Sequence, residues 1–351
     1  MANAVTEFDA NKQPHRRFNP LLREWILVSP HRTQRPWQGQ VETPGSKGEV
    51  EYDPTCYMCP GNKRSTGNVN PHYQDVFVFD NDFPALLPEG QRGCVNEGNL
   101  LVAETEAGIC RVLCFSPKHH LTLSMMEPAD IRAVVDCWSG QFVELGTRPD
   151  INYVQIFENR GAMMGASNPH PHCQIWSTRT IPNIPKTEQE SLLAYRAAHG
   201  SCLLCDYFQL EANSRERAVV ENEHFLALVP YWAVWPFETM VISRGHVASI
   251  EALNSAERDA FSDVLKRLTT RYDNLFQTSF PYSMGFHQRP TDGKDHPEWH
   301  FHAHFFPPLL RSAAVRKFMV GFELLAMPQR DITAETSAER LRAVPDSHHT
   351  F

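Results

Sequence analysis

The stretch that decides the fold is Ser167-Asn168-Pro169-His170-Pro171-His172-Cys173-Gln174, which lies between two segments with β character, 152–157 and 174–177. In an extended backbone, residues two apart share a face, so His170, His172 and Gln174 would form one polar row. The prolines favour the entrance or edge of a strand, because they remove backbone donors. Such a row offers a metal ligand or a nucleophile beside a donor for a phosphoryl oxygen. A lone histidine is usually an ordinary surface or core residue, so this interpretation depends on further histidines.

Composition limits the classes of protein to consider. The chain has 351 residues, 42% hydrophobic and 21% charged, which is typical of a soluble globular protein of one large or two ordinary domains. A net charge of −8 argues against a dedicated nucleic-acid surface. No apolar signal core and no run long enough to cross a bilayer are found, so we expect a cytoplasmic protein without membrane segments. Nine cysteines with two C-x-x-C pairs favour metal ligation over a disulfide framework.

Apolar periodicity predicts the main secondary structure. Residues 128–145 keep helical spacing, and a second helix begins at an Asn254 cap with Glu257 three residues on. Runs rich in apolar and β-branched residues predict strands at 25–29, 76–79, 108–115, 223–231, 239–243, 281–286 and 299–306.

The chain repeats one order of features. A C-x-x-C pair, strands, a histidine after a strand, a helix, a strand with a loop, and a histidine-bearing strand occur once with Cys56, Cys59, His119 and His170, and again with Cys202, Cys205, His246 and His300. Chance is less able to produce both sets in the same order than either alone. The pattern therefore predicts a duplication, with related halves at 1–195 and 196–351.

These motifs resemble the galactose-1-phosphate uridylyltransferases of the histidine-triad superfamily. The resemblance rests on Asn-Pro-His-Pro-His-x-Gln at 168–174, the upstream C-x-x-C and the downstream His-x-His-Ala-His, and it continues through 15–38, 229–238, 270–285 and 309–325. It implies an α+β fold of two histidine-triad-like halves, each an antiparallel half-barrel sheet with flanking helices. It also implies a nucleotidyltransferase of galactose metabolism, in which UDP-glucose gives its uridylyl group to a histidine and galactose 1-phosphate then accepts it.

The resemblance implies a role for each residue of the motif. His172 would be the nucleophile, since a neutral imidazole is a good nucleophile near pH 7. Gln174 would hold the transferring phosphoryl oxygen, and Ser167 would contact a phosphate. Substrate contacts would come from Arg32, Arg35, Asn81, Asp82, Asn159, Lys317, Phe318, Val320, Gly321, Glu323 and Gln329. The C-terminal segment would complete the active site of a neighbouring subunit, which implies a homodimer.

Metal sites follow from the resemblance and from the duplication. The resemblance implies a closed structural Zn²⁺ site at Cys56, Cys59, His119 and His170, with His120 as a rival to His119. It implies a second site, for Zn²⁺ or Fe²⁺, at Glu188, His287, His302 and His304, with Glu190 as a rival to Glu188. The duplication predicts a further Cys₂His₂ site at Cys202, Cys205, His246 and His300, which we do not expect in the better-known members of the family. The alternative is that these four side chains merely pack.

Three other functions stay open. Another histidine-triad nucleotidyltransferase, such as a dinucleotide phosphorylase, would prefer adenine and would not use galactose 1-phosphate. A hydrolase is less favoured, because Gln174 stands where a third histidine would provide a proton. A metal-stabilised nucleotide-binding module would use the histidines only as ligands.

Overall fold

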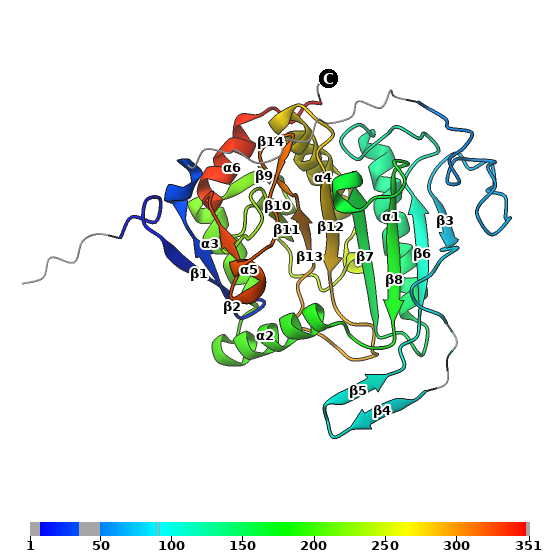
Figure 1. The fold of residues 1–351 in the computed structure, drawn as a ribbon, viewed down its shortest axis with the longest axis horizontal. Helices are drawn as coiled ribbons and strands as arrows, with labels where there is room; N and C mark the ends of the chain where they lie inside the picture. The colour runs from blue at the N-terminus through cyan, green and yellow to red at the C-terminus, as the bar shows by residue number, and fades with distance from the viewer. Residues whose placement is uncertain (1–7, 35–49, 89, 91, 349–351) are drawn as a thin grey trace, which may run out of the picture.

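The computed structural model describes residues 8–34, 50–88, 90 and 92–348, and its centre is one nine-stranded antiparallel sheet (Figure 1). Its strands, in spatial order, are β3 (Phe77–Asp80), β6 (Gly108–Cys114), β8 (His172–Thr178), β7 (Tyr153–Arg160), β12 (Tyr282–His287), β13 (His302–Phe306), β11 (Thr239–Ser243), β10 (Phe225–Leu228) and β9 (Ala218–Glu221). Strands were predicted near all of these except β9.

The two halves of the chain meet at one strand pair within this sheet. β7 of the first half pairs with β12 of the second, from Tyr282 opposite Arg160 to Gly285 opposite Phe157. The strand orders β6-β8-β7 and β11-β13-β12 match across this seam. The predicted α+β class with antiparallel sheet and flanking helices is confirmed, and the sheets of the two halves are continuous.

Two helices, both predicted, cover one face of the sheet. α1 (Pro128–Gly146) buries its periodic apolar residues, including Val134, Trp138 and Phe142, in the main core. α4 (Ser255–Phe276) begins with a capping box, in which the Asn254 side chain accepts from the Glu257 backbone while the Glu257 carboxylate accepts from the Asn254 backbone. The two helices also pack on each other. Sheet residues that alternate away from these helices are left to form a site on the other face.

Two helices that follow one another after β8 were not predicted. α2 (Asn183–His199) and α3 (Leu203–Ser214) follow β8, and the N-cap of α3 is Cys202, whose thiol accepts from the backbone N–H of Cys205. The second C-x-x-C pair therefore forms the first turn of a helix. Leu203, Leu204 and Phe208 pack with β10 and β11 residues in a second core.

The polar row predicted at 170–174 is divided in the structure. β8 begins at His172, so His172 and Gln174 share a face, whereas His170 lies before the strand. The Pro171 carbonyl accepts from the backbone N–H of Phe115, and Pro171 has no N–H to continue the ladder. β13 likewise begins at His302 and excludes His300, so the strand predicted from 299 is too long. In both halves the first histidine of the motif is turned toward a cysteine pair.

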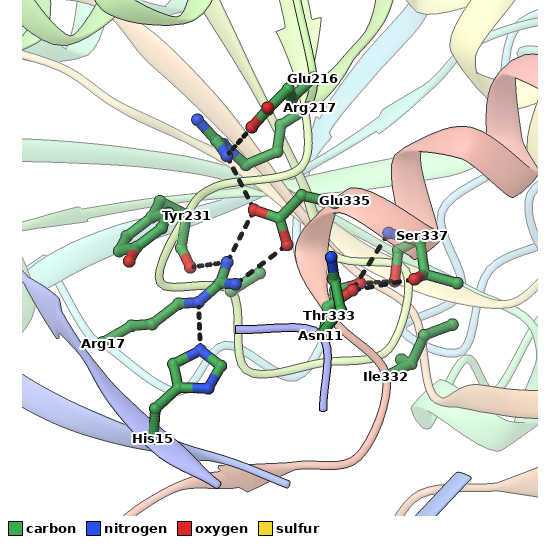
Figure 2. A network of polar contacts seen from close by, with 12 residues as sticks. Asn11, His15, Arg17, Glu216, Arg217, Tyr231, Ile332, Thr333, Glu335 and Ser337 are labelled. Carbon is green, nitrogen blue, oxygen red and sulfur yellow. Dashed lines mark hydrogen bonds and ion pairs between the residues drawn. The ribbon is translucent and has the colours of Figure 1, made fainter. Parts of the chain in front are cut away.

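The two ends of the described chain meet beside the sheet. β1 (His15–Asn19), β2 (Glu24–Val28) and β16 (Gln329–Arg330) form a small sheet next to α6 (Ala334–Ala343). Figure 2 shows the network that holds them: Arg17 donates two hydrogen bonds of 3.0 Å to Glu335, which also accepts from Arg217 at 2.7 Å. The remaining elements are the exposed hairpin of β4 (Cys94–Glu97) and β5 (Leu101–Glu104), the pair β14 (Leu309–Ser312) and β15 (Val315–Arg316), the short helix α5 (Phe322–Leu325), and the 3-10 turns η1 (Pro30–Gln34), η2 (Ala162–Met164) and η3 (Ile250–Ala252). No helix among the described residues is long and apolar enough to cross a membrane.

Candidate active site and metal centres

His172 has one ring nitrogen held by the backbone and one left for chemistry. Its Nδ1 lies 2.7 Å from the carbonyl oxygen of His170. Because a carbonyl oxygen only accepts, Nδ1 carries the proton, and the lone pair is on Nε2. Burial lowers the pKa of His172 below its ordinary value, against the opposing effect of this hydrogen bond. The imidazole is therefore neutral near pH 7 with Nε2 as its nucleophilic atom.

Gln174 lies on the same face of β8, in a row of side chains that crosses the sheet. The register places Phe157 of β7 opposite Gln174, Gly285 of β12 opposite Phe157, and His304 of β13 opposite Gly285. A Cβ atom at position 285 would lie 3.0 Å from the Ile156 carbonyl oxygen. Glycine avoids this close contact and leaves no side chain over this part of the sheet. The sheet therefore presents Gln174 and the histidines of β13 on one surface.

The first cysteine and histidine set comes together as predicted. The ligand atoms of Cys56, Cys59, His119 and His170 lie within 4.8 Å of one another. Cys59 Sγ is 3.5 Å from His119 Nδ1 and 3.6 Å from His170 Nδ1. A tetrahedral Zn²⁺ with ordinary bond lengths would separate sulfur and nitrogen ligands by about 3.5 Å. His170 Nε2 lies 3.0 Å from the Ser116 carbonyl oxygen, which leaves Nδ1 facing the cysteines. These side chains fit a closed zinc site.

The second cysteine and histidine set repeats this geometry. The ligand atoms of Cys202, Cys205, His246 and His300 also lie within 4.8 Å of one another. Cys205 Sγ is 3.2 Å from His246 Nδ1 and 3.4 Å from His300 Nδ1. His300 Nε2 lies 2.8 Å from the carbonyl oxygen of Ser243, the counterpart of Ser116. The orientation of the histidine is thus the same in both halves, and this set fits the same kind of ion.

The third set joins a carboxylate to three imidazoles. Glu188 on α2 lies 3.0 Å from His287 Nδ1 through Oε1, and 3.7 Å from His302 Nε2 through Oε2. His302 Nε2 and both ring nitrogens of His304 are buried without a hydrogen-bond partner among the described residues, and Glu188 Oε2 lies 2.9 Å from His287 Nδ1. One ligand atom from each of Glu188, His287, His302 and His304 lies within 4.8 Å of the others, and burying such groups unpaired is costly, so this set fits a metal ion. His302 Nδ1 lies 2.8 Å from the His300 carbonyl oxygen, as His172 does from that of His170.

Neither rival ligand joins these sets. His119, and not His120, belongs to the first set. Glu190 is exposed and pairs with Arg23 at 2.7 Å, so Glu188 is the carboxylate of the third set.

The predicted substrate contacts divide into two groups. The first lies near β8 and comprises Asn81, Asp82, Asn159 and the exposed loop residue Ser167; Asn159 Oδ1 accepts from the Ser283 hydroxyl at 2.6 Å. The second lies beside β2 and α5, where Arg32, Val320, Glu323 and Gln329 line a cavity of about 460 Å³ with Leu27 and Phe322. Figure 1 places α5 and β2 on the opposite side of the molecule from β8. Lys317 pairs with Glu323, Phe318 and Gly321 are exposed, and Arg35 lies outside the described residues.

Three further residues support the site and were not predicted. The Asn168 side chain contacts Cys56 Sγ at 3.4 Å and accepts from the His170 backbone N–H at 2.9 Å. The Tyr73 hydroxyl lies 3.1 Å from His170 Nε2, and Trp176 donates to Gln174 Oε1 at 3.0 Å. Asn168 stands inside the motif, which was a usable signal, whereas Tyr73 is 97 residues from its partner in sequence.

Comparison with known proteins identifies the family. Residues 3–182 match the family described as galactose-1-phosphate uridyl transferase, N-terminal domain, and residues 188–351 match its C-terminal domain. The chain belongs to the galactose-1-phosphate uridylyltransferase family. The family's members are nucleotidyltransferases, so the chain is an enzyme of that class by descent.

Similarity to named family members extends over nearly the whole chain. It is 51% identical to the galactose-1-phosphate uridylyltransferase of Haemophilus influenzae, with 97% of each chain covered, and 48% identical to that of Saccharomyces cerevisiae, with 98% of each covered. A solved structure of a uridylyltransferase matches with a TM-score of 0.74 at 25% identity, covering 94% of this chain and 98% of that one. An ADP-glucose phosphorylase from Arabidopsis thaliana has the same fold, with a TM-score of 0.74 at 23% identity, covering 95% and 99%.

Proposed function

We propose that this protein transfers a uridylyl group from UDP-glucose to galactose 1-phosphate through a covalent intermediate on His172. The observation that carries the proposal is the hydrogen bond between His172 Nδ1 and the His170 carbonyl oxygen, which leaves Nε2 as the nucleophile. The names of the relatives support the choice of substrates.

The reaction consists of two displacements at one phosphorus. In the first, Nε2 forms a bond to the α-phosphorus of UDP-glucose, and the bond to the oxygen of glucose 1-phosphate breaks. In the second, a phosphate oxygen of galactose 1-phosphate attacks, and the P–N bond breaks. The Nδ1–H bond to the His170 carbonyl stabilises the positive charge that the ring gains. The Gln174 amide would donate to a phosphoryl oxygen, and Ser167 would contact the second phosphate.

Labelling tests the nucleophile. Incubation with UDP-glucose carrying a labelled α-phosphate should give the native protein an acid-labile, base-stable label, and His172→Asn should take none. His199→Asn, an exposed histidine at the end of α2, is the matched control and should label as the native protein does. A labelled His172→Asn protein would refute the assignment.

The main alternative is a phosphorylase that acts on another nucleotide sugar. One structural neighbour is named an ADP-glucose phosphorylase, and its likeness to this chain shows a shared fold. Rates with UDP-glucose plus galactose 1-phosphate, compared with ADP-glucose plus phosphate, distinguish the two. Turnover of only the second pair would favour the phosphorylase.

We propose Zn²⁺ for both Cys₂His₂ sets and Zn²⁺ or Fe²⁺ for the Glu188 set. A zinc ion with four protein ligands supplies a cross-link and no open coordination position. In the first half the zinc ion would cross-link Cys56 and Cys59 to His170, which lies two residues before His172. In the second half it would join α3 to the segment before β13. The Glu188 set would join α2 to β12 and β13 on the surface that carries Gln174.

Metal content tests these assignments separately. Each of the double variants Cys56→Ser/Cys59→Ser and Cys202→Ser/Cys205→Ser should lose about one zinc per chain, and Glu188→Gln should lower the third metal. Cys94→Ser/Cys137→Ser is the matched control, because neither cysteine belongs to a ligand set. An unchanged zinc content in the Cys202/Cys205 variant would show that this set merely packs.

We propose that the active enzyme is a homodimer with composite sites. The position of Arg32, Glu323 and Gln329 far from β8 supports this, because one chain cannot use both groups on one substrate. Mixing equal amounts of inactive His172→Asn and inactive Arg32→Ala chains, with complete dissociation and reassociation, should restore about a quarter of native activity, since half of the dimers are then mixed and each has one intact site. No recovery would contradict composite sites.

We also propose that residues 1–195 and 196–351 are the two halves of the chain, with the boundary between them inside α2.

A further inference from the structure

Gln174 can serve as a donor only if its amide has one of its two orientations. The oxygen and nitrogen of a carboxamide diverge from one carbon and are told apart by their hydrogen bonds. If the amide turned over, its oxygen would face the phosphoryl oxygen and repel it. Something in the protein must therefore choose the orientation, and the inference below rests on the proposed function of Gln174.

Trp176 makes that choice. It lies two residues after Gln174 on β8, so both side chains are on one face, and its Nε1 is 3.0 Å from Gln174 Oε1. An indole N–H only donates, so its partner has to be the amide oxygen. The amide NH₂ then points away from Trp176, and His172 is the neighbour on the other side of Gln174 along this face.

The indole ring is itself held in place. Phe157 of β7, which lies opposite Gln174, meets the Trp176 ring edge-on with centroids 5.6 Å apart and an angle of 78°. Gln155, opposite Trp176, is fixed by donating to the carbonyl oxygens of Ile156 and Phe286 at 3.0 and 2.9 Å. Among the described residues, no other side-chain hydrogen bond is found for Gln174. The orientation of its amide thus depends on one donor.

The second half of the chain provides an internal comparison. His302, His304 and Phe306 occupy the positions of His172, Gln174 and Trp176 on the matching strand β13. Phe306 stacks on His304 with centroids 5.4 Å apart and an angle of 10°. An aromatic ring is present in both halves, but the N–H occurs only where an amide has to be oriented. Packing alone would be satisfied by phenylalanine.

We infer that Trp176 is a positioning residue for uridylyl transfer, which fixes the Gln174 amide with its NH₂ toward the transferring phosphoryl group. In this role Trp176 acts through Gln174. Its loss should slow the chemical step by about the worth of one neutral hydrogen bond, roughly three- to tenfold, with little change in KM.

A double-mutant cycle tests the inference. Single-turnover uridylylation is measured for the native protein, Trp176→Phe, Gln174→Met and the double variant. Trp176→Phe should slow the reaction roughly three- to tenfold when Gln174 is present, and should have no effect when residue 174 is methionine. Equal effects in both backgrounds, or none in either, would overturn the inference. Trp235→Phe, a partly buried tryptophan in the second half, is the matched control and should react at the native rate.

A second measurement separates this inference from the proposed function. The indole N–H resonance of Trp176, identified by its absence in Trp176→Phe, should shift in Gln174→Met whether or not the protein takes up label. If the native protein labels but this resonance does not move, the inference fails and the function stands. If the resonance moves but no label forms, the function fails and the contact stands.

Discussion

Replacing Asp273 with asparagine should cause a large loss of stability, because this carboxylate neutralises a buried arginine. The Asp273 side chain on α4 is 2% exposed and lies 2.9 Å from Arg160 at the end of β7, whose side chain is 6% exposed. Asp273 also accepts from the Ser124 hydroxyl and from the Phe280 backbone N–H. Asparagine preserves the shape but removes the charge, and an NH₂ placed toward Arg160 would meet a guanidinium that can only donate.

The structure sets the size of the effect. Removing one member of a buried ion pair costs about 3–5 kcal/mol, because the other charge stays buried without compensation. Arg160 Nε and Nη1 already have no hydrogen-bond partner among the described residues. Glu158 reduces the loss. Burial, with a smaller contribution from the Asp273 charge, raises the pKa of Glu158 to about 7 against the lowering effects of Arg160 and Tyr282. Losing the Asp273 charge therefore favours ionised Glu158 beside Arg160. We therefore expect the lower end, about 3 kcal/mol at pH 8.

Urea unfolding of Asp273→Asn, Arg160→Met and the double variant measures the coupling. The double variant should cost at least about 2 kcal/mol less than the sum of the single variants, because neither charge is then left alone. Asp150→Asn is the control, since its pair with Arg92 is exposed and should contribute under about 0.5 kcal/mol. Additive effects, or an Asp273→Asn loss as small as the control's, would refute the reasoning.

Three other changes test other parts of the fold. Burial opposes ionisation of Glu335, but the hydrogen bond and charge of Arg17, with help from Arg217, lower its pKa from 4.5 to about 2. The stability that ionised Glu335 contributes is therefore present above the unfolded pKa and is lost as pH falls from 4.5 to about 2. Glu335→Gln should lower the free energy of unfolding by about 1–2 kcal/mol at pH 7 and by almost nothing near pH 2. Thermal unfolding measured as a function of pH checks this. Gly108→Ala should cost about 3 kcal/mol in urea, because its Cβ would lie 2.0 Å from the Ser177 carbonyl oxygen; a loss under 1 kcal/mol would contradict this geometry. Gly140→Ala, in an exposed position of α1 with nothing within 4 Å, should instead stabilise by about 0.5–1 kcal/mol, and a lower melting temperature would contradict that expectation.

Elements with a local signal were predictable. The Asn254 cap and the apolar stripe of α4 lie within the helix itself, and the run of apolar and β-branched residues in β11 gives its bounds, 239–243, correctly. α2 and α3 were missed because their buried faces are decided by partners far away in sequence. Glu188, a buried carboxylate on α2, has its place only once β12 brings His287 to it. The second C-x-x-C was predicted only as a pair of metal ligands, and the structure places it in the first turn of α3, where the Cys205 backbone N–H donates to Cys202 Sγ.

The sequence by itself determined which residues belong to the site. The family resemblance implied the four residues of the first and third sets, and the repeated order of cysteines and histidines predicted the four residues of the second set. The sequence also singled out His172 and Gln174 as a pair on one strand.

Only the tertiary structure decided how these residues can act. The proton of His172 is placed by a backbone carbonyl, and the amide of Gln174 is turned by an indole, both of which depend on where strand β8 begins and which face it shows. The distance between β8 and the cavity at Arg32 depends on the seam between β7 and β12, which spreads one chain across a single wide sheet. Spacing in sequence cannot give these facts, because hydrogen-bond direction and strand register are set by partners across the fold.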